Sequence, residues 1–166
     1  MRQHQRALVH VEAKLTALGK KLPPPSAPKG SYISCQWADD STLHLAGHLP
    51  MKENGDLVKG KVGKDVTVEQ ANAAAELACL SLLATLKKEL GDLDQVKQIV
   101  KVVGFVNCVD GFEQQPAVIN GCSDLLGKVF PDGKGQHARS AVGTNALPLN
   151  VAVEIEMIVK THGKKK

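Results

Sequence analysis

Residues 67–108 read TVEQANAAAELACLSLLATLKKELGDLDQVKQIVKVVGFVNC, and this stretch decides the fold. Apolar residues recur three and four positions apart over residues 68–90, which predicts a long helix. Thr67 and Gln70 form the capping-box pattern at its start. Residues 98–108 follow as a strand with apolar side chains on both sides, so we expect both faces of this strand to be buried.

The segments on either side of this stretch extend the pattern to an α+β domain. We expect helices over residues 4–22 and 114–128, strands over 31–38, 42–49, 138–146 and 151–160, a proline-rich connector over 23–28, and a hairpin or mobile loop over 51–66. The last two strands are joined by a turn at 147–150. This order predicts helices on one face of a mixed sheet. Few helices remain for the other face, so we expect oligomerisation through the sheet.

The composition is that of one globular domain. The chain has 166 residues, 43% of them hydrophobic, and no apolar stretch reaches the length of a membrane span. No apolar run follows the basic start, so we expect a cytoplasmic protein without a secretory signal. The formal charge is +4, of which Lys164, Lys165 and Lys166 supply three. The nearly neutral body and 3% aromatic content do not favour nucleic acid as a partner.

We divide the chain into an N-terminal helix with its connector (1–29), the main domain (30–162) and a basic tail (163–166). The N-terminal helix is expected to pack on the main domain, and a helix that binds a partner is the alternative.

The sequence gives no metal-binding or nucleotide-binding motif. The four cysteines form no C-x-x-C pair, so we expect buried free thiols. His44 and His48 lie on one predicted strand, about 13 Å apart, which is too far to share a metal ion. These spacings therefore predict no metal site.

The segment that can carry chemistry is 139–156. Arg139 begins a predicted strand, and its planar guanidinium suits a carboxylate ligand. Glu154 and Glu156 lie on one face of the next strand. The alternative to a ligand site is a structural Arg–Glu pair within the sheet.

These residues resemble the YjgF/Rid family, the reactive-intermediate deaminases that are also described as L-PSP endoribonuclease-like proteins. The resemblance is carried by residues 30–32, 45–50, 96–101, 118–120 and, most specifically, 139–156. It is nearest to a longer subgroup that has an N-terminal helix and the phrase found at 104–107.

The resemblance implies a chorismate-mutase-like fold and a homotrimer whose sheets face inward, with sites in the clefts between subunits. It also implies hydrolysis of 2-imino or enamine acids, such as 2-iminobutanoate or 2-iminopropanoate, to 2-keto acids and ammonia, without a cofactor. Two further readings stay open: a non-catalytic regulatory protein that binds a small carboxylate, and an endoribonuclease, which is the least favoured.

Carried over by position, the resemblance makes Arg139 the carboxylate-binding residue and Glu154 the residue that orients or activates water. Further ligand-binding positions are Tyr32, Ala46, Gly47, His48, Asn120 and Ala141. Gly47 would let the ligand or a backbone amide approach closely.

Three of these positions depart from the family pattern, because Ala46, His48 and Ala141 stand where Ser, Gln and Cys are common. His48 could contact the ligand and donate a proton. Alternatively, it is a hydrogen-bonded structural histidine.

Overall fold

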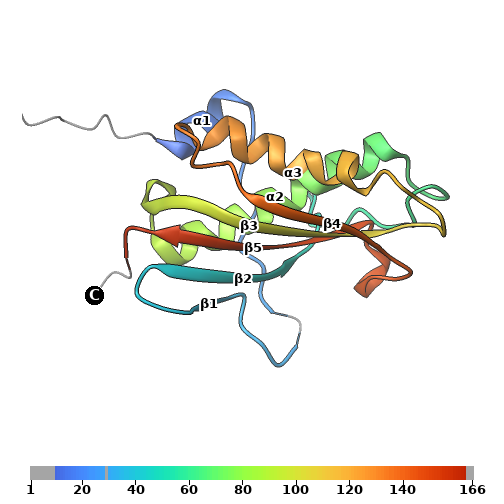
Figure 1. Cartoon of the computed structure of the whole chain (residues 1–166), viewed down its shortest axis with the longest axis horizontal. Helices are drawn as coiled ribbons and strands as arrows, with labels where there is room; N and C mark the ends of the chain where they lie inside the picture. Colours follow the sequence, from blue (N-terminus) through green and yellow to red (C-terminus); the bar gives the residue numbers. More distant parts are fainter. Residues whose placement is uncertain (1–9, 29, 164–166) are drawn as a thin grey trace, which may run out of the picture.

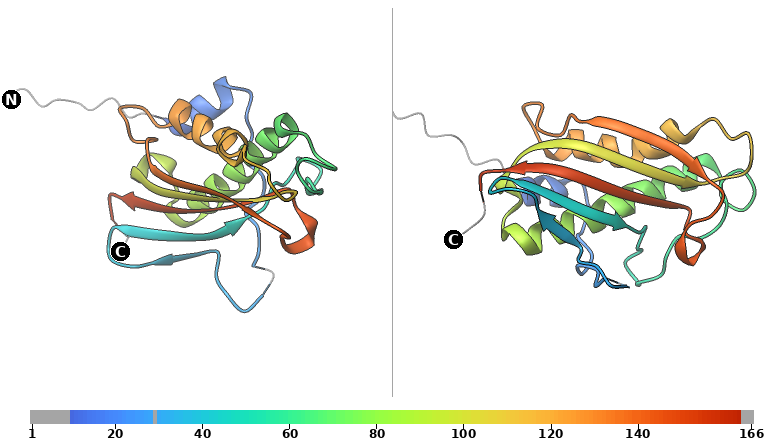
Figure 2. Two further views of the ribbon diagram at one scale, coloured as in Figure 1. Left: turned by 45° about the vertical axis from the view of Figure 1, so that its right-hand side comes forward. Right: turned by 60° about the horizontal axis from the view of Figure 1, so that its bottom comes forward.

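The computed structural model describes residues 10–28 and 30–163 (Figure 1). In this part of the chain a five-stranded sheet carries three α-helices on one face (Figure 2). The elements are α1 (Val11–Ala17), β1 (Cys35–Trp37), β2 (Thr42–His48), α2 (Val68–Leu90), β3 (Val96–Asn107), α3 (Gln115–Val129), β4 (Ala138–Thr144) and β5 (Val153–Thr161), with single 3₁₀ turns η1 (Leu93–Gln95) and η2 (Pro148–Asn150). This order confirms the predicted α+β pattern.

The strand order in the sheet is β1-β2-β5-β3-β4, and only β3 and β4 run parallel. Strand β5 therefore lies in the middle of the sheet, and β3 separates it from β4. The idea of a structural Arg–Glu pair between these two strands is wrong, because they are not neighbours. The connection through η2 instead crosses the end of β3.

Helix α2 forms as the sequence predicts. The Thr67 hydroxyl accepts from the Gln70 amide, the Gln70 side chain accepts from the Thr67 amide, and Gly91 ends the helix with a φ of 78°. The alanine-rich face is fully buried against β5, β2 and α3. Small side chains on this face let the helix lie close to the sheet.

The second face of β3 is not covered by described residues. Val102 and Val106 are fully buried under the helices, but Val103 and Phe105, which point the other way, are only partly buried. Val142, the β4 neighbour of Phe105, is 44% exposed. The expectation that both faces are buried is therefore not met within one chain. The right panel of Figure 2 shows the sheet in front of the helices.

Helix α1 is shorter than predicted at its C-terminal end. It ends at Ala17, because Gly19 adopts a left-handed φ of 67° and turns the chain away from the helix axis. Val11 and Leu15 are buried against the main domain. The N-terminal part of the predicted helix, before residue 10, and the lysines at 164–166 lie outside the described residues.

Strand β1 is shorter than predicted, because it covers only residues 35–37, whereas the pattern predicted 31–38. Within 51–66, an antiparallel bridge between Met51 and Leu57 closes a short hairpin-like turn, which fits the predicted hairpin. Bridges from Lys59 to Val151 and from Val62 to Cys108 hold the rest of the segment on the domain. The loop is therefore anchored at several points.

Cys35, Cys79, Cys108 and Cys122 are free thiols, as predicted, and all but Cys35 are buried. Between residues 10 and 163, apart from the undescribed residue 29, no group of three or more His, Cys, Asp or Glu side chains is placed to hold a metal ion. Over the same residues, no helix is long and apolar enough to cross a membrane.

Candidate functional site

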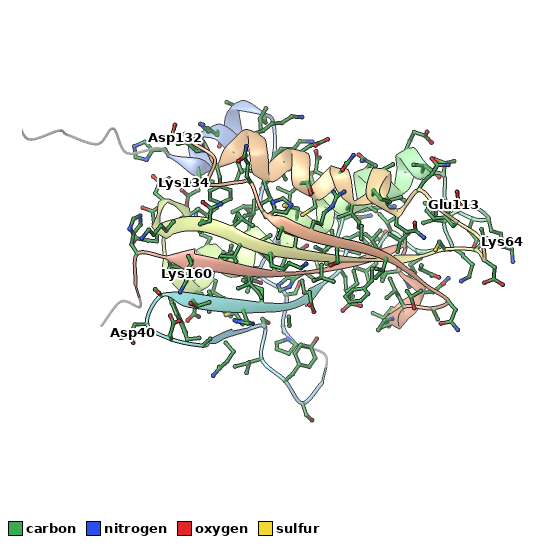
Figure 3. The ribbon with its side chains drawn as sticks, in the orientation of Figure 1. Asp40, Lys64, Glu113, Asp132, Lys134 and Lys160 are labelled. Carbon is green, nitrogen blue, oxygen red and sulfur yellow. The ribbon has the colours of Figure 1, made fainter. Side chains whose placement is uncertain are left out.

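The predicted site residues fall into two groups at different places in the fold. Tyr32, Ala46, Gly47, His48 and Glu154 line one pocket of about 350 Å³ at the end of β2. The second group consists of Arg139, Asn120 and Ala141, on β4 and α3, and none of the three lines that pocket. In Figure 3, the labels Asp132 and Lys134 mark the loop that leads into the edge strand β4, and Asp40 marks the turn between β1, the other edge strand, and β2.

A β-bulge in β2 shapes the pocket. Leu45 pairs with Met157 and His48 pairs with Ile155, so three steps along β2 match two along β5. The extra residue lies at Ala46 and Gly47. It reverses the alternation, so His48 is buried beneath α2 while His44 is exposed on the opposite face. The strict alternation expected over 42–49 missed this reversal.

Gly47 lies directly against the side chain of Glu154. A Cβ at position 47 would lie 2.8 Å from Cδ of Glu154 and would overlap its carboxylate oxygen. Any other residue at this position would therefore displace the carboxylate. The sequence-based expectation was a close approach by ligand or backbone, whereas the group that approaches Gly47 within the chain is Glu154.

Glu154 is half-buried at the pocket, on the face of the sheet away from the helices. Loss of hydration raises the pKa of its carboxyl above the ordinary value, and the negative charge of Glu156 raises it further. A carboxylate in this position is a better proton acceptor than an exposed glutamate, which suits it to act on a bound water.

The His48 side chain is fully engaged within the protein. Nδ1 lies 2.7 Å from the Ala46 carbonyl oxygen and Nε2 lies 2.7 Å from the Thr85 hydroxyl. A carbonyl can only accept, so Nδ1 carries the proton and Nε2 accepts from Thr85. Burial lowers the His48 pKa, which favours the neutral ring. This matches the structural alternative raised from the sequence, and the imidazole would have to break both hydrogen bonds to reach a ligand.

The rest of the pocket is mostly apolar. Tyr32 is 52% exposed at its rim. Its walls come from the connector, the segment after β2 and the turn at η2, and they include Ala27, Pro28, Leu49, Met51, Leu57, Pro148 and Leu149. Leu149 has a left-handed φ of 57°, which is uncommon for a residue with a branched side chain. The connector of the N-terminal segment thus contributes to the pocket.

Arg139 projects from β4 toward α3. Its Nη1 donates to Oδ1 of Asn120 at 2.8 Å and to Oγ of Ser123 at 3.0 Å, and Nη2 lies 3.4 Å from the Pro116 carbonyl oxygen. The structure thus brings Arg139 and Asn120 into contact. Ala141, two residues along the same face of β4, packs against the core.

Arg139 and Glu154 point to opposite faces of the sheet. Arg139 pairs with Val102, which is buried under the helices. Glu154 pairs with Phe105, on the other face of β3. Within one chain, Arg139 and Glu154 therefore do not come together.

Sequence reasoning missed Ser123 and His137, which contact each other at 2.9 Å. A signal for them was present. His137 lies two residues before Arg139, a spacing that places both side chains on one side of an extended backbone, while Asn120 and Ser123 are three apart and share a helix face. The sequence did not show that these two faces meet.

The family described as "YjgF/chorismate mutase-like, putative endoribonuclease" matches residues 12–160. Protein TCP17 of Trypanosoma cruzi is 41% identical over 152 residues, which cover 92% of this chain and 94% of that protein. Among solved structures, the protein Atu1372 "with unknown function" from Agrobacterium tumefaciens is 39% identical, with a TM-score of 0.82 over 92% of this chain and 93% of that one. A "putative endoribonuclease" from Shewanella oneidensis is 31% identical, with a TM-score of 0.86 over 90% and 98% of the two chains.

Proposed function

Because the chain belongs to the YjgF/chorismate mutase-like family, we propose that it hydrolyses reactive 2-imino or enamine acids to 2-keto acids and ammonia. The reaction would take place in a cleft formed where Arg139 of one copy meets the Glu154 pocket of another copy in a homotrimer. The observation that carries this proposal is the division of the site. The guanidinium of Arg139, which suits a carboxylate ligand, and the carboxylate of Glu154, which suits a proton, lie on opposite faces of the sheet in one chain.

The uncovered face of the sheet supports assembly through this surface. Val103, Phe105 and Val142 form an apolar row there, and Val142 is 44% exposed. Burial of such a row stabilises association by about 25 cal/mol per Å² of apolar surface removed from water. Assembly through the sheet would place the Glu154 pocket at the interface, and Arg139 of a neighbouring copy would reach it from β4, which is an edge strand.

The chemistry requires positioning more than covalent catalysis. The 2-imino group is already electrophilic at carbon. Arg139 would hold the substrate carboxylate, while Glu154 would take a proton from water as its oxygen bonds to that carbon. Return of that proton to nitrogen gives a carbinolamine, with a hydroxyl and an amino group on one carbon. Transfer of the remaining hydroxyl proton to the amino group then breaks the C–N bond, which releases ammonia and leaves the keto oxygen. The raised pKa of Glu154 supports these transfers near neutral pH.

The walls of the pocket favour a substrate with an apolar side chain. Met51, Leu57 and Leu149 offer aliphatic surface, and Ala46 adds no hydroxyl. Imines derived from aliphatic amino acids would bury their side chains here, whereas those with charged side chains would lose hydration without a partner.

The test is a coupled assay in which an amino-acid oxidase generates imines, with wild type, Arg139→Ala and Arg139→Lys compared. We expect wild type to accelerate imine loss, and Arg139→Ala to lose at least about 100-fold in kcat/KM, since one bidentate pair to a charged group is removed. Arg139→Lys keeps the charge without the fork and should recover only part of the rate. Light scattering checks that each variant keeps the wild-type mass. Full turnover by Arg139→Ala would exclude the assigned role.

A second candidate is a protein that binds a small carboxylate without turning it over. The observation in its favour is that position 46 lacks a hydroxyl and the His48 ring is engaged with Thr85. It predicts that 2-oxobutanoate raises the melting temperature, with no turnover of any imine. A ribonuclease is less favoured, because the net charge without the three terminal lysines is only +1.

A further inference from the structure

Arg139 lies at the end of a chain of hydrogen bonds that neither the family assignment nor the proposed reaction explains. His137 Nδ1 lies 2.7 Å from the Gly135 carbonyl oxygen, and its Nε2 lies 2.9 Å from Ser123 Oγ. Ser123 Oγ also accepts from Arg139 Nη1 at 3.0 Å. Three segments, α3, the loop before β4 and β4 itself, therefore meet at the guanidinium group.

The hydrogen positions follow from the chemistry of the groups. The Gly135 carbonyl can only accept, so His137 Nδ1 donates and Nε2 is left as an acceptor. The Ser123 hydroxyl then donates to Nε2 and turns its lone pairs toward Arg139. Burial and the charge of Arg139 lower the His137 pKa, which is consistent with a neutral ring.

These hydrogen bonds determine which edge of the Arg139 guanidinium is free. Both hydrogens of Nη1 are directed at protein oxygens, those of Asn120 and Ser123. Nε makes no hydrogen bond to a described residue, and Nη2 has only the long contact to Pro116. A carboxylate can therefore pair with the edge formed by Nε and Nη2.

We propose that Ser123 and His137 are positioning residues that lock the plane of the Arg139 guanidinium and direct its Nε/Nη2 edge to the ligand carboxylate. A bidentate pair requires this plane to be fixed, and a fixed plane lowers the entropy lost on binding. His137 acts through Ser123, since it gives the hydroxyl an acceptor and so keeps the oxygen lone pairs facing Nη1. The role of Ser123 and His137 in ligand binding rests on the proposed function, whereas the fixed plane of the Arg139 guanidinium depends only on contacts within the protein.

The first test measures that plane without any ligand. The chain has three arginines, Arg2, Arg6 and Arg139, so ¹⁵N-arginine labelling gives a simple spectrum that Arg139→Lys assigns. We expect separate Nη1 and Nη2 signals for Arg139 in the wild type, because rotation about the Cζ–Nε bond is slow. Ser123→Ala should merge them. Merged signals in the wild type, or separate signals in Ser123→Ala, would overturn the proposal.

The role of His137 is tested by a pair of substitutions. His137→Gln keeps an acceptor for the Ser123 hydroxyl, and His137→Leu does not. We expect separate signals in the glutamine variant and merged signals in the leucine variant. Asp124→Asn, at an exposed neighbour of Ser123 on α3, is the control that leaves the signals unchanged. If the leucine variant does not fold, merged signals in His137→Gln would still overturn the role given to His137, and Ser123→Ala still tests the locked plane.

The second test uses 2-oxobutanoate as the probe in titration calorimetry. Its Kd should rise about tenfold in Ser123→Ala and His137→Leu, because a tenfold change corresponds to the net contribution of roughly one hydrogen bond. The Kd should stay near the wild-type value in His137→Gln. Equal Kd values in all variants would reject positioning. If the wild type does not bind 2-oxobutanoate, the proposed function loses support, while the NMR result still judges the locked plane.

Discussion

The carboxylate of Glu154 fills the space that a side chain at Gly47 would occupy. The β-bulge in β2 brings the backbone at residue 47 against the glutamate, so a Cβ at this position would collide with the carboxylate. The position of the proposed proton acceptor thus depends on a glycine in a different strand. This relationship can be tested with a single methyl group.

Gly47→Ala should displace Glu154 and lower kcat/KM for imine hydrolysis at least about tenfold, because the proton acceptor moves away from the position that it needs. The melting temperature should fall as well, since the added methyl group overpacks the site. Gly127→Ala, in α3, is the matched control. No atom lies within 4 Å of a Cβ at that position. There the same change should leave activity intact and raise stability by about 0.5–1 kcal/mol. Wild-type turnover in Gly47→Ala would show that Glu154 is not the acceptor.

Glu154→Gln should stabilise the protein at neutral and alkaline pH. The pKa of Glu154 is raised in the folded state, so the folded protein holds this proton more tightly than the unfolded chain, and the ionised carboxylate disfavours folding. The variant's melting temperature should exceed that of wild type at pH 8. The difference should shrink as the pH falls to the ordinary glutamate value of 4.5. A difference that does not change with pH would mean that ionisation of Glu154 is not its cause.

The helix and strand order of this protein could be predicted because local signals agree with the packing. Thr67 and Gln70 mark the start of α2, and the apolar pattern of β3 marks a strand. The order of strands in the sheet could not be predicted in this way. The turn before β5 looks like the turn of a hairpin, yet β3 lies between β4 and β5.

Candidate residues for the site could be chosen from the sequence, but their arrangement could not be predicted. Arg139 and Glu154 are chosen by residue type and family position, while their opposite orientation follows from pairing with neighbouring positions on β3, Val102 and Phe105. The burial of His48 depends on the β-bulge in β2. A bulge adds one residue to a strand and so moves the following side chains to the other face of the sheet, and no clear sequence pattern predicts it. Contacts between distant segments, such as Ser123 with His137, need the tertiary structure.

Thr85→Val should destabilise the fold by about 1–3 kcal/mol, because it leaves the buried Nε2 of His48 without a hydrogen-bond donor. Urea unfolding monitored by circular dichroism measures the change. Thr16→Val is the matched control, since the hydroxyl of Thr16 is exposed on a helix, where its loss should cost less than about 0.5 kcal/mol. Equal effects of the two substitutions would mean that the hydrogen bond of His48 adds little to stability.

Two inactive variants should restore activity to each other if the site is shared between chains. Arg139→Ala retains the Glu154 pocket, and Glu154→Gln retains the arginine. In a closed trimer that contains both variants, about one third of the clefts would pair an intact arginine with an intact glutamate. Co-expression with two different tags, followed by tandem purification, isolates the mixed trimers for the imine assay. Activity well above that of either parent would support a shared cleft. Mixed trimers as inactive as their parents would place both groups in one chain's site, which the opposite orientation of the two side chains argues against.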